Sequence, residues 1–240
     1  MPLATVAPSG SALGVRALHV ALPPVSTAAL VPFLRGANHI FGRATPYTNT
    51  LPVTTNLADC IILGLWTDGA TSAPVASGAG ATWTTYATGD HKFSLVVGYN
   101  CSAGQTTCTV TAPGATGSGN QGINIDCSVW SGIRSASNPV VGSPDITEAG
   151  TVNTITSGSV SYSTNQLVIA SATITNVSVG LAPTWSNTGG ATPRETNTSG
   201  AQYLQVPYFI AISSNSTTLT ENSGGTGIMA IILAILQNAP

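Results

Sequence analysis

The chain has 240 residues, of which 6 are Lys or Arg and 8 are Asp or Glu, so only 6% of its side chains are charged. Soluble domains have about 25% charged residues, so this chain is poor in charge. Its hydrophobic residues nevertheless make up 42% of the sequence. This composition excludes a charged disordered tail and a coiled coil, which both need many charges. It leaves room for one large or two small domains with a real core.

The first 49 residues predict an extended N-terminal arm, because prolines and glycines interrupt them repeatedly. Residues 26–35 are the one stretch that competes for a helix, but Pro32 would remove a backbone hydrogen bond and clash with the preceding turn. Residues 15–22, VRALHVAL, predict a single strand that lies over the rest of the protein or over a neighbouring subunit. The interruptions are Pro2, Pro8, Gly10, Gly14, Pro23, Pro24, Pro32 and Pro46.

Residues 50–240 contain short runs rich in Val, Ile, Thr and aromatic residues, bounded by Gly, Pro, Asn and Ser. This pattern is typical of an all-β chain. The last run, IMAIILAIL, is apolar at consecutive positions, so we expect it to be covered on both faces, either inside the protein or against a partner. The predicted strands are residues 60–66, 93–99, 123–130, 166–174, 203–212 and 228–236.

Two halves of the chain, about residues 57–133 and 165–236, resemble each other. DCIILGLW is matched by NQLVIASATI, and ATWTTY by APTWSN, so that Trp83 corresponds to Trp185. Each half supplies four or five strands whose apolar face must be covered. The simplest prediction is a two-sheet antiparallel β-sandwich of jelly-roll type. The alternative is two separate small sandwiches joined by residues 134–150.

The charge pattern argues against two classes of partner. The net charge is -2, and Lys92 is the only lysine, whereas phosphate binding needs clustered Lys and Arg. The longest apolar stretch, residues 228–236, is far shorter than the roughly 20 residues of a membrane-spanning helix. Residues 1–10 lack the pattern of a secretion signal. We therefore predict neither nucleic acid nor a membrane as partner, and synthesis in the cytoplasm.

We also predict no enzyme activity, metal or cofactor. The sequence has no nucleophile elbow, phosphate loop or H-E-x-x-H pair. The histidines His19, His39 and His91 fall in unrelated segments, which does not predict a metal site. Asp145 and Glu148 are the closest carboxylate pair outside the strands and could contribute to a Ca²⁺ site, but acids in turns ordinarily bond their own backbone.

All four cysteines lie in the first half, and two pairs could form in three connectivities. Cys101 and Cys108 flank SAGQTT, a turn-like insert, so they could face each other across a hairpin and form a disulfide. Cys60 and Cys127 lie in apolar runs, where a reduced cysteine acts as a small hydrophobic residue. The spacing does not match a zinc site.

The aromatic residues are the candidate binding residues. Trp83, Trp185, Tyr86 and Tyr203 could line a face on which sugar rings stack. The competing interpretation is that they fill the core, where such side chains bury large areas. The repeated T-W placement in both halves favours the structural role.

The strand pattern of both halves, with its T-W element, S-T-T-x-T element and a strand such as GINIDCSVWSGI, resembles the β-sandwich structural proteins of tailed bacteriophage virions, over about residues 50–237. The resemblance implies a non-enzymatic virion component, most simply a capsid decoration or cement protein. It implies binding to the major capsid protein or tail proteins, self-association into a homo-oligomer, and the N-terminal arm as an anchor. The alternative function is a carbohydrate- or receptor-binding module.

Overall fold

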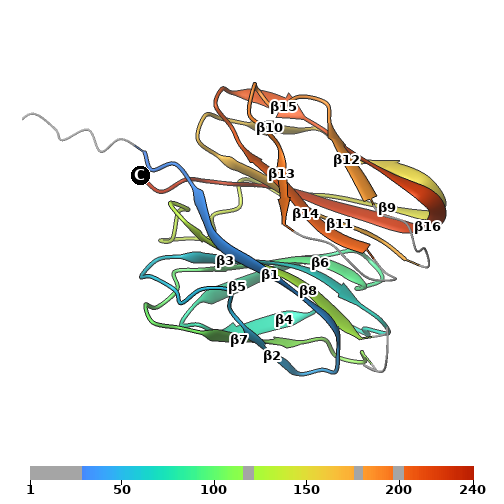
Figure 1. The fold of residues 1–240 in the computed structure, drawn as a ribbon, viewed down its shortest axis with the longest axis horizontal. Coiled ribbons are helices and arrows are strands. Elements are labelled where there is room, and N and C mark those ends of the chain that lie inside the picture. Colours follow the sequence, from blue (N-terminus) through green and yellow to red (C-terminus); the bar gives the residue numbers. More distant parts are fainter. Residues whose placement is uncertain (1–28, 116–121, 176–180, 197–202) are drawn as a thin grey trace, which may run out of the picture.

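Two halves built from β-strands lie one above the other in the molecule (Figure 1). The computed structural model describes residues 29–115, 122–175, 181–196 and 203–240. All regular structure in these residues is β-strand, and none of them belongs to a helix long and apolar enough to cross a bilayer. The all-β prediction is therefore confirmed for the described part of the chain.

The first half contains two antiparallel sheets. Its inner sheet, which faces the second half, has the order β1-β8-β3-β6-β5, and its outer sheet has the order β2-β7-β4. The strands are β1 (Phe33–Arg43), β2 (Tyr47–Thr50), β3 (Cys60–Thr67), β4 (Val75–Gly78), β5 (Thr82–Ala87), β6 (Phe93–Tyr99), β7 (Thr107–Thr111) and β8 (Ile123–Ser131).

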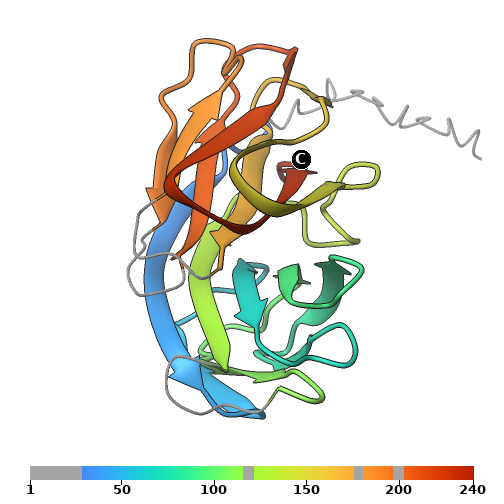
Figure 2. The same cartoon turned by 90° about the vertical axis from the view of Figure 1, so that its right-hand side faces the viewer.

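The second half is organised around one long strand, β16, which curves through the half (Figure 2). The main sheet has the order β12-β16-β11-β14-β13, with β9 also paired to β16, and a separate pair joins β10 to β15. The strands are β9 (Asp145–Thr156), β10 (Val160–Tyr162), β11 (Leu167–Ile174), β12 (Leu181–Trp185), β13 (Arg194–Thr196), β14 (Tyr203–Ile210), β15 (Asn215–Thr217) and β16 (Leu219–Leu236).

The two halves repeat the same strand pairing. In the first half β8 lies between β1 and β3, and β7 lies between β2 and β4. In the second half the C-terminal part of β16 pairs with β9 and β11, while its N-terminal part pairs with β9 and β12. One long strand in the second half thus takes the place of two short strands in the first.

The described interior contains three large apolar cores and a small cluster of Trp66, Phe93 and Ala230. Strand β3 shows why: Ile61 and Leu63 point into a first core between the two sheets of the first half, whereas Cys60 and Ile62 point into a middle core between the halves. Strands buried on both faces must be apolar at consecutive positions, which explains the run in β16. The middle core consists of Cys60, Ile62, Leu95, Val97, Trp130, Ile133, Val140, Leu167, Ile169, Val206, Tyr208, Ile232, Ala234 and Leu236.

A single two-sheet jelly roll is not confirmed, because the described strands form four sheets, none of which closes. The predicted arm, residues 1–49, is only partly described. Residues 1–28, which include the predicted strand 15–22, lie outside the described residues. Residues 33–43 form β1 and pair with β8, and β2 pairs with β7, so this part of the predicted arm belongs to the sheets of the first half.

Candidate functional site

The start of β1 is fastened to the C-terminal segment of the chain. The Leu30 amide donates to the Ala239 carbonyl at 3.0 Å, and the Ala239 amide donates to the Gly132 carbonyl at 2.8 Å. Gly132 has φ +78°, and a Cβ there would lie 2.7 Å from the Val31 carbonyl oxygen. Only glycine fits this crossing without strain, and the path of the chain into β1 is therefore fixed.

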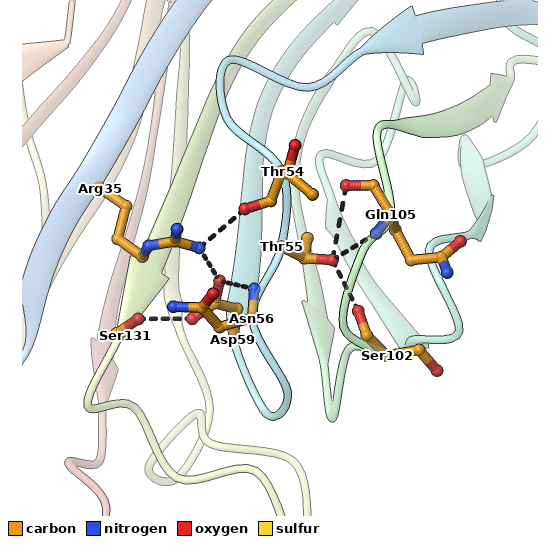
Figure 3. Close-up of polar contacts among 8 residues, drawn as sticks. All are labelled: Arg35, Thr54, Thr55, Asn56, Asp59, Ser102, Gln105 and Ser131. Carbon is orange, nitrogen blue, oxygen red and sulfur yellow. Dashed lines mark hydrogen bonds and ion pairs between the residues drawn. The ribbon is translucent and has the colours of Figure 1, made fainter.

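A buried carboxylate holds the next residues of β1 in place (Figure 3). Asp59, which is 1% exposed, accepts hydrogen bonds from the Arg35 guanidinium, from the Ser131 hydroxyl and, at 2.7 Å, from the Asn56 amide. The Arg35 guanidinium also donates to the Thr54 carbonyl at 3.0 Å. Because charged hydrogen bonds are the strong ones, this Asp59 cluster ties β1 to β8 and to the loop before β3.

The same loop is tied to the turn between β6 and β7. The Thr55 hydroxyl donates to the Ser102 carbonyl at 2.6 Å and accepts from the Gln105 amide at 3.0 Å. The backbones of Thr55 and Gln105 are also hydrogen bonded, at 2.9 Å. These polar contacts stabilise the loop that carries Asp59, and so they position the beginning of β1 indirectly.

Beside the start of β1, an apolar groove opens where the two halves meet. It has a volume of about 450 Å³. In its floor, Trp130 of the first half and Tyr208 of the second half make an edge-to-face contact with ring centroids 4.8 Å apart. We call this the seam groove. It is lined by Phe33, Leu34, Trp130, Ala191, Thr192, Arg194, Tyr208, Phe209, Ile210 and Ile212.

The rim of the seam groove is unusually exposed for apolar side chains. Phe33 is 55% exposed on one side and Ile212 is 62% exposed on the other. Leu30 and Val31, on the segment that leads to Phe33, are also more than half exposed. A contiguous apolar patch at a groove is typical of an interaction site, whereas the buried floor gives it a fixed shape.

Of the four predicted sugar-binding residues, the three whose side chains are described do not form one face. The Trp83 ring lies over Gly98, where a Cβ would come within 2.6 Å of it, and its Nε1 donates to the Gly78 carbonyl at 3.1 Å. Tyr86 packs against the middle core and accepts a hydrogen bond from Asn138 at 2.8 Å. Trp83 and Tyr86 therefore have structural roles in the first half.

The other two predicted residues belong to the second half. Trp185, in β12, packs edge-to-face on Phe209 with ring centroids 5.0 Å apart. The side chain of Tyr203 lies outside the described part. Trp185 and Trp83 pack against different cores, and their strands have different partners: β5 pairs with β6, whereas β12 pairs with β16. The sequence correspondence between these tryptophans is therefore not a structural equivalence.

Trp185 does line a cavity, of about 640 Å³, between β12 and the segment before β13. The cavity lies within the range of small-molecule sites. Its walls combine apolar groups with the hydroxyls of Thr184 and Thr188 and with Arg194. The Trp185 Nε1 is buried without a hydrogen-bond partner.

The four cysteines are free thiols buried in the first half and at the seam. Cys101 and Cys108 point into the same core, as a pair across a hairpin would, but they are not joined in the structure. Burial raises the pKa of Cys101 to about 12 and that of Cys108 to about 11. Burial also raises the pKa values of Cys60 and Cys127. Thiols of this kind are poor nucleophiles.

The predicted acid pair is not brought together. Both residues lie in β9 rather than in a turn. The Asp145 carboxylate accepts hydrogen bonds from the Thr147 hydroxyl and from the Gly158 amide, 13 residues along the chain, both at 2.8 Å. Burial, followed by the charge of Asp90, raises the pKa of Glu148. In the described residues, no three His, Cys, Asp or Glu side chains are grouped so that they could hold a metal ion.

The sequence did not single out the rim of the seam groove. Phe33 lies next to Pro32 in the stretch weighed as a helix, and Ile212 ends a predicted strand. The signal in the sequence that pointed to this rim was the apolar pair Leu30 and Val31, directly before Pro32.

Comparisons of the chain with protein-family models, with curated proteins and with solved structures gave no match.

Proposed function

We propose that the protein is a non-enzymatic virion structural protein, a capsid decoration or cement protein that binds neighbouring subunits. The seam groove carries this proposal. Its floor is preformed by two aromatic rings from different halves, and its rim exposes Phe33 and Ile212. Buried aromatic anchors beside exposed apolar groups are the usual composition of a protein interface.

The strand order also supports the proposal. In each half, strands equivalent to 1-8-3-6 form one layer and strands equivalent to 2-7-4 form the other. We infer that each half is a jelly roll, an architecture found in viral capsid and lectin domains. Fold alone does not establish function, so this argument supports the groove without replacing it.

The low charge of the surface fits the same role. With 14 charged side chains in 240 residues, the protein has little electrostatic repulsion to oppose close packing of copies. Many weak contacts, multiplied over the copies on a particle, give tight overall attachment. Such a surface suits a subunit held by many neighbours.

The test is co-sedimentation with capsids assembled from the major capsid protein encoded in the same genome. We expect saturable pelleting of the full chain and weaker pelleting of the double variant Phe33→Ser/Ile212→Ser. Leu57→Ser is the matched control, because Leu57 is an exposed apolar residue that does not line the groove. Absence of pelleting with the full chain overturns the proposal. A truncation for this purpose should remove residues 1–28 only, because β1 begins at Phe33.

The alternative, a carbohydrate-binding module, is favoured by one observation, the cavity beside Trp185. An aromatic wall with hydroxyl and guanidinium groups suits a neutral sugar. Screening the full chain on a glycan array tests it, with Trp185→Ala as the binding-deficient variant and Trp83→Ala as the control. Binding that survives Trp185→Ala rejects this site.

A further inference from the structure

We propose that the seam groove of one copy binds residues 15–22 of a second copy, so that the protein assembles by exchange of its N-terminal segments. The inference rests on the proposed function, because it names a partner for the same groove. It goes beyond that function by identifying the segment that fills the groove and the copy that supplies it.

The lining of the seam groove suits an apolar ligand of extended shape. Its floor is aromatic, its rim has Phe33 on β1 and Ile212 just after β14, and Arg194 is the only charged residue that lines it. Strand β1 is the terminal strand of the inner sheet and, in the described residues, pairs with β8 alone. A terminal strand can accept another strand by main-chain hydrogen bonds.

Residues 15–22 have the composition that such a groove requires. In an extended conformation side chains alternate between faces, so that Leu18, Val20 and Leu22 share one face of the segment VRALHVAL. Three anchors spaced by about 7 Å span about 13 Å. His19 is then on the opposite face with the small residues Ala17 and Ala21. Within residues 1–28, this is the one segment with three large apolar residues on a common face.

The position of the segment in the chain brings it to the groove. The described chain starts at residue 29, four residues before Phe33 on the groove rim. Leu22 is followed by Pro23 and Pro24, which restrict the backbone to extended conformations. The amide of Leu30 is already bound to the C-terminal segment. Folding back onto the groove of the same chain would require a reversal directly after the two prolines, whereas exchange between copies requires none, so we assign the groove of a second copy.

Sedimentation velocity over a concentration series of the full chain is the first experiment. We expect self-association, and we expect the dissociation constant to rise about tenfold or more in Leu18→Ser/Val20→Ser and, separately, in Phe33→Ser/Ile212→Ser, because each variant removes two apolar anchors. All the substituted rim residues are exposed, and thermal unfolding checks that both variants remain folded. Leu57→Ser serves as the control and should leave the dissociation constant unchanged.

Cross-linking identifies the copy that supplies the segment. A tagged Leu18→Cys chain is mixed with an untagged Ile212→Cys chain and treated with a bis-maleimide. The native thiols are buried and have raised pKa values, so the introduced cysteines react first. We expect a cross-linked dimer that contains the tag. In the double variant Leu18→Cys/Ile212→Cys at high dilution, a cross-link within one chain would overturn the assignment to a second copy.

The outcomes separate the two proposals. If the chain self-associates but both double variants associate as tightly as the unmodified chain, exchange of residues 15–22 is wrong while the capsid role stands. If the full chain stays monomeric at every concentration, exchange is also wrong. If the full chain self-associates through the segment but does not pellet with capsids, the proposed function is wrong and the exchange stands.

Discussion

The two halves approach each other closely at Gly64 in β3, and this contact offers a sharp test of how they stack. A Cβ at this position would lie 2.6 Å from Cγ2 of Val206 and 3.1 Å from Oγ of Ser171, both in the second half. Real Cβ atoms essentially never come within 3.0 Å of another heavy atom. The substitution Gly64→Ala therefore forces the two inner sheets, or the Val206 side chain, to move.

The expected cost follows from packing. Adding a methyl group to a tightly packed interior costs about 1–3 kcal/mol. The backbone of Gly64 is that of an ordinary strand, which alanine adopts freely, so no conformational penalty enters. In a chain of this length each kcal/mol lowers Tm by about 2–4 °C. We expect Gly64→Ala to lower the free energy of unfolding by this amount without loss of the fold.

Two companion variants isolate the cause. Gly150→Ala, in β9, has no atom within 4 Å of the new Cβ, and we expect it to be neutral or to stabilise by about 0.4–1 kcal/mol. Val206→Ala removes the atom that the new methyl group meets. In the double variant Gly64→Ala/Val206→Ala the cost should be less than the sum of the single costs, by about 0.5–3 kcal/mol for residues in contact.

The measurement is urea unfolding of the unmodified chain and the four variants, monitored by tryptophan fluorescence. Far-UV circular dichroism checks the fold of each. If Gly64→Ala is as harmless as Gly150→Ala, the inner sheets do not meet as described. If the costs of Gly64→Ala and Val206→Ala are simply additive, the contact between these two residues is not the cause.

Three further predictions concern other features. Asp59→Asn should lower the free energy of unfolding by about 2–4 kcal/mol, because it leaves a largely buried guanidinium without its charged partner. Asp90→Asn, in a partly exposed ion pair, should cost less than about 1 kcal/mol; urea unfolding of both variants tests this difference. Because burial raises the pKa of Cys108 to about 11 and that of Cys101 to about 12, the unfolded chain loses these protons first, and stability should fall by about 1.4 kcal/mol per pH unit per thiol above pH 9; urea midpoints that are unchanged between pH 8 and pH 10 contradict this. Trp185→Ala should destabilise the second half by about 2–4 kcal/mol through loss of its contact with an aromatic ring, and a loss below 1 kcal/mol in thermal unfolding argues against that packing.

Much of the strand structure could be predicted from the sequence. Strands β3, β6, β8, β11 and β14 and the C-terminal part of β16 coincide with the apolar runs, because strands buried on both faces are apolar at most positions. Strand β1 was missed as a strand. Its sequence, FLRGANHIFGR, alternates poorly: its polar residues Arg35 and Asn38 donate hydrogen bonds to Thr54, in the loop after β2, and to Thr50, the last residue of β2.

The number of layers could not be counted from the last strand alone. The run CIILGLW in β3 is as continuous as IMAIILAIL in β16. Each half therefore contains a strand that must be covered on both of its faces. A stack of two halves satisfies this requirement, whereas a single pair of sheets does not. Strands β4, β10 and β13 are short and contain no run of apolar residues, so the sequence did not reveal them. Without these strands the sequence could not show that β12 pairs with β16 whereas β5 pairs with β6.

The site was predicted least well, because its residues belong to different halves. Trp130 and Tyr208 lie in separate predicted strands, and their contact exists only because the inner sheets stack. The exposure of Phe33 and Ile212 depends on the same arrangement. Sequence reasoning selected Trp83 and Trp185 because aromatic rings can stack on sugars, whereas the repeat of their surroundings favoured a structural role.

The groove is therefore a property of the stack and of neither half by itself. Its wall on one side is the start of β1, held by the Asp59 cluster, and its wall on the other side is the end of β14 with Ile212. Any change that shifts one inner sheet against the other must alter the distance between these walls. The same two sheets make the contact at Gly64, because β3 and β8 are neighbours in the first half and β14 carries Val206 in the second. A partner that fills the groove contacts both halves at once, and its binding energy adds directly to the stability of the stack.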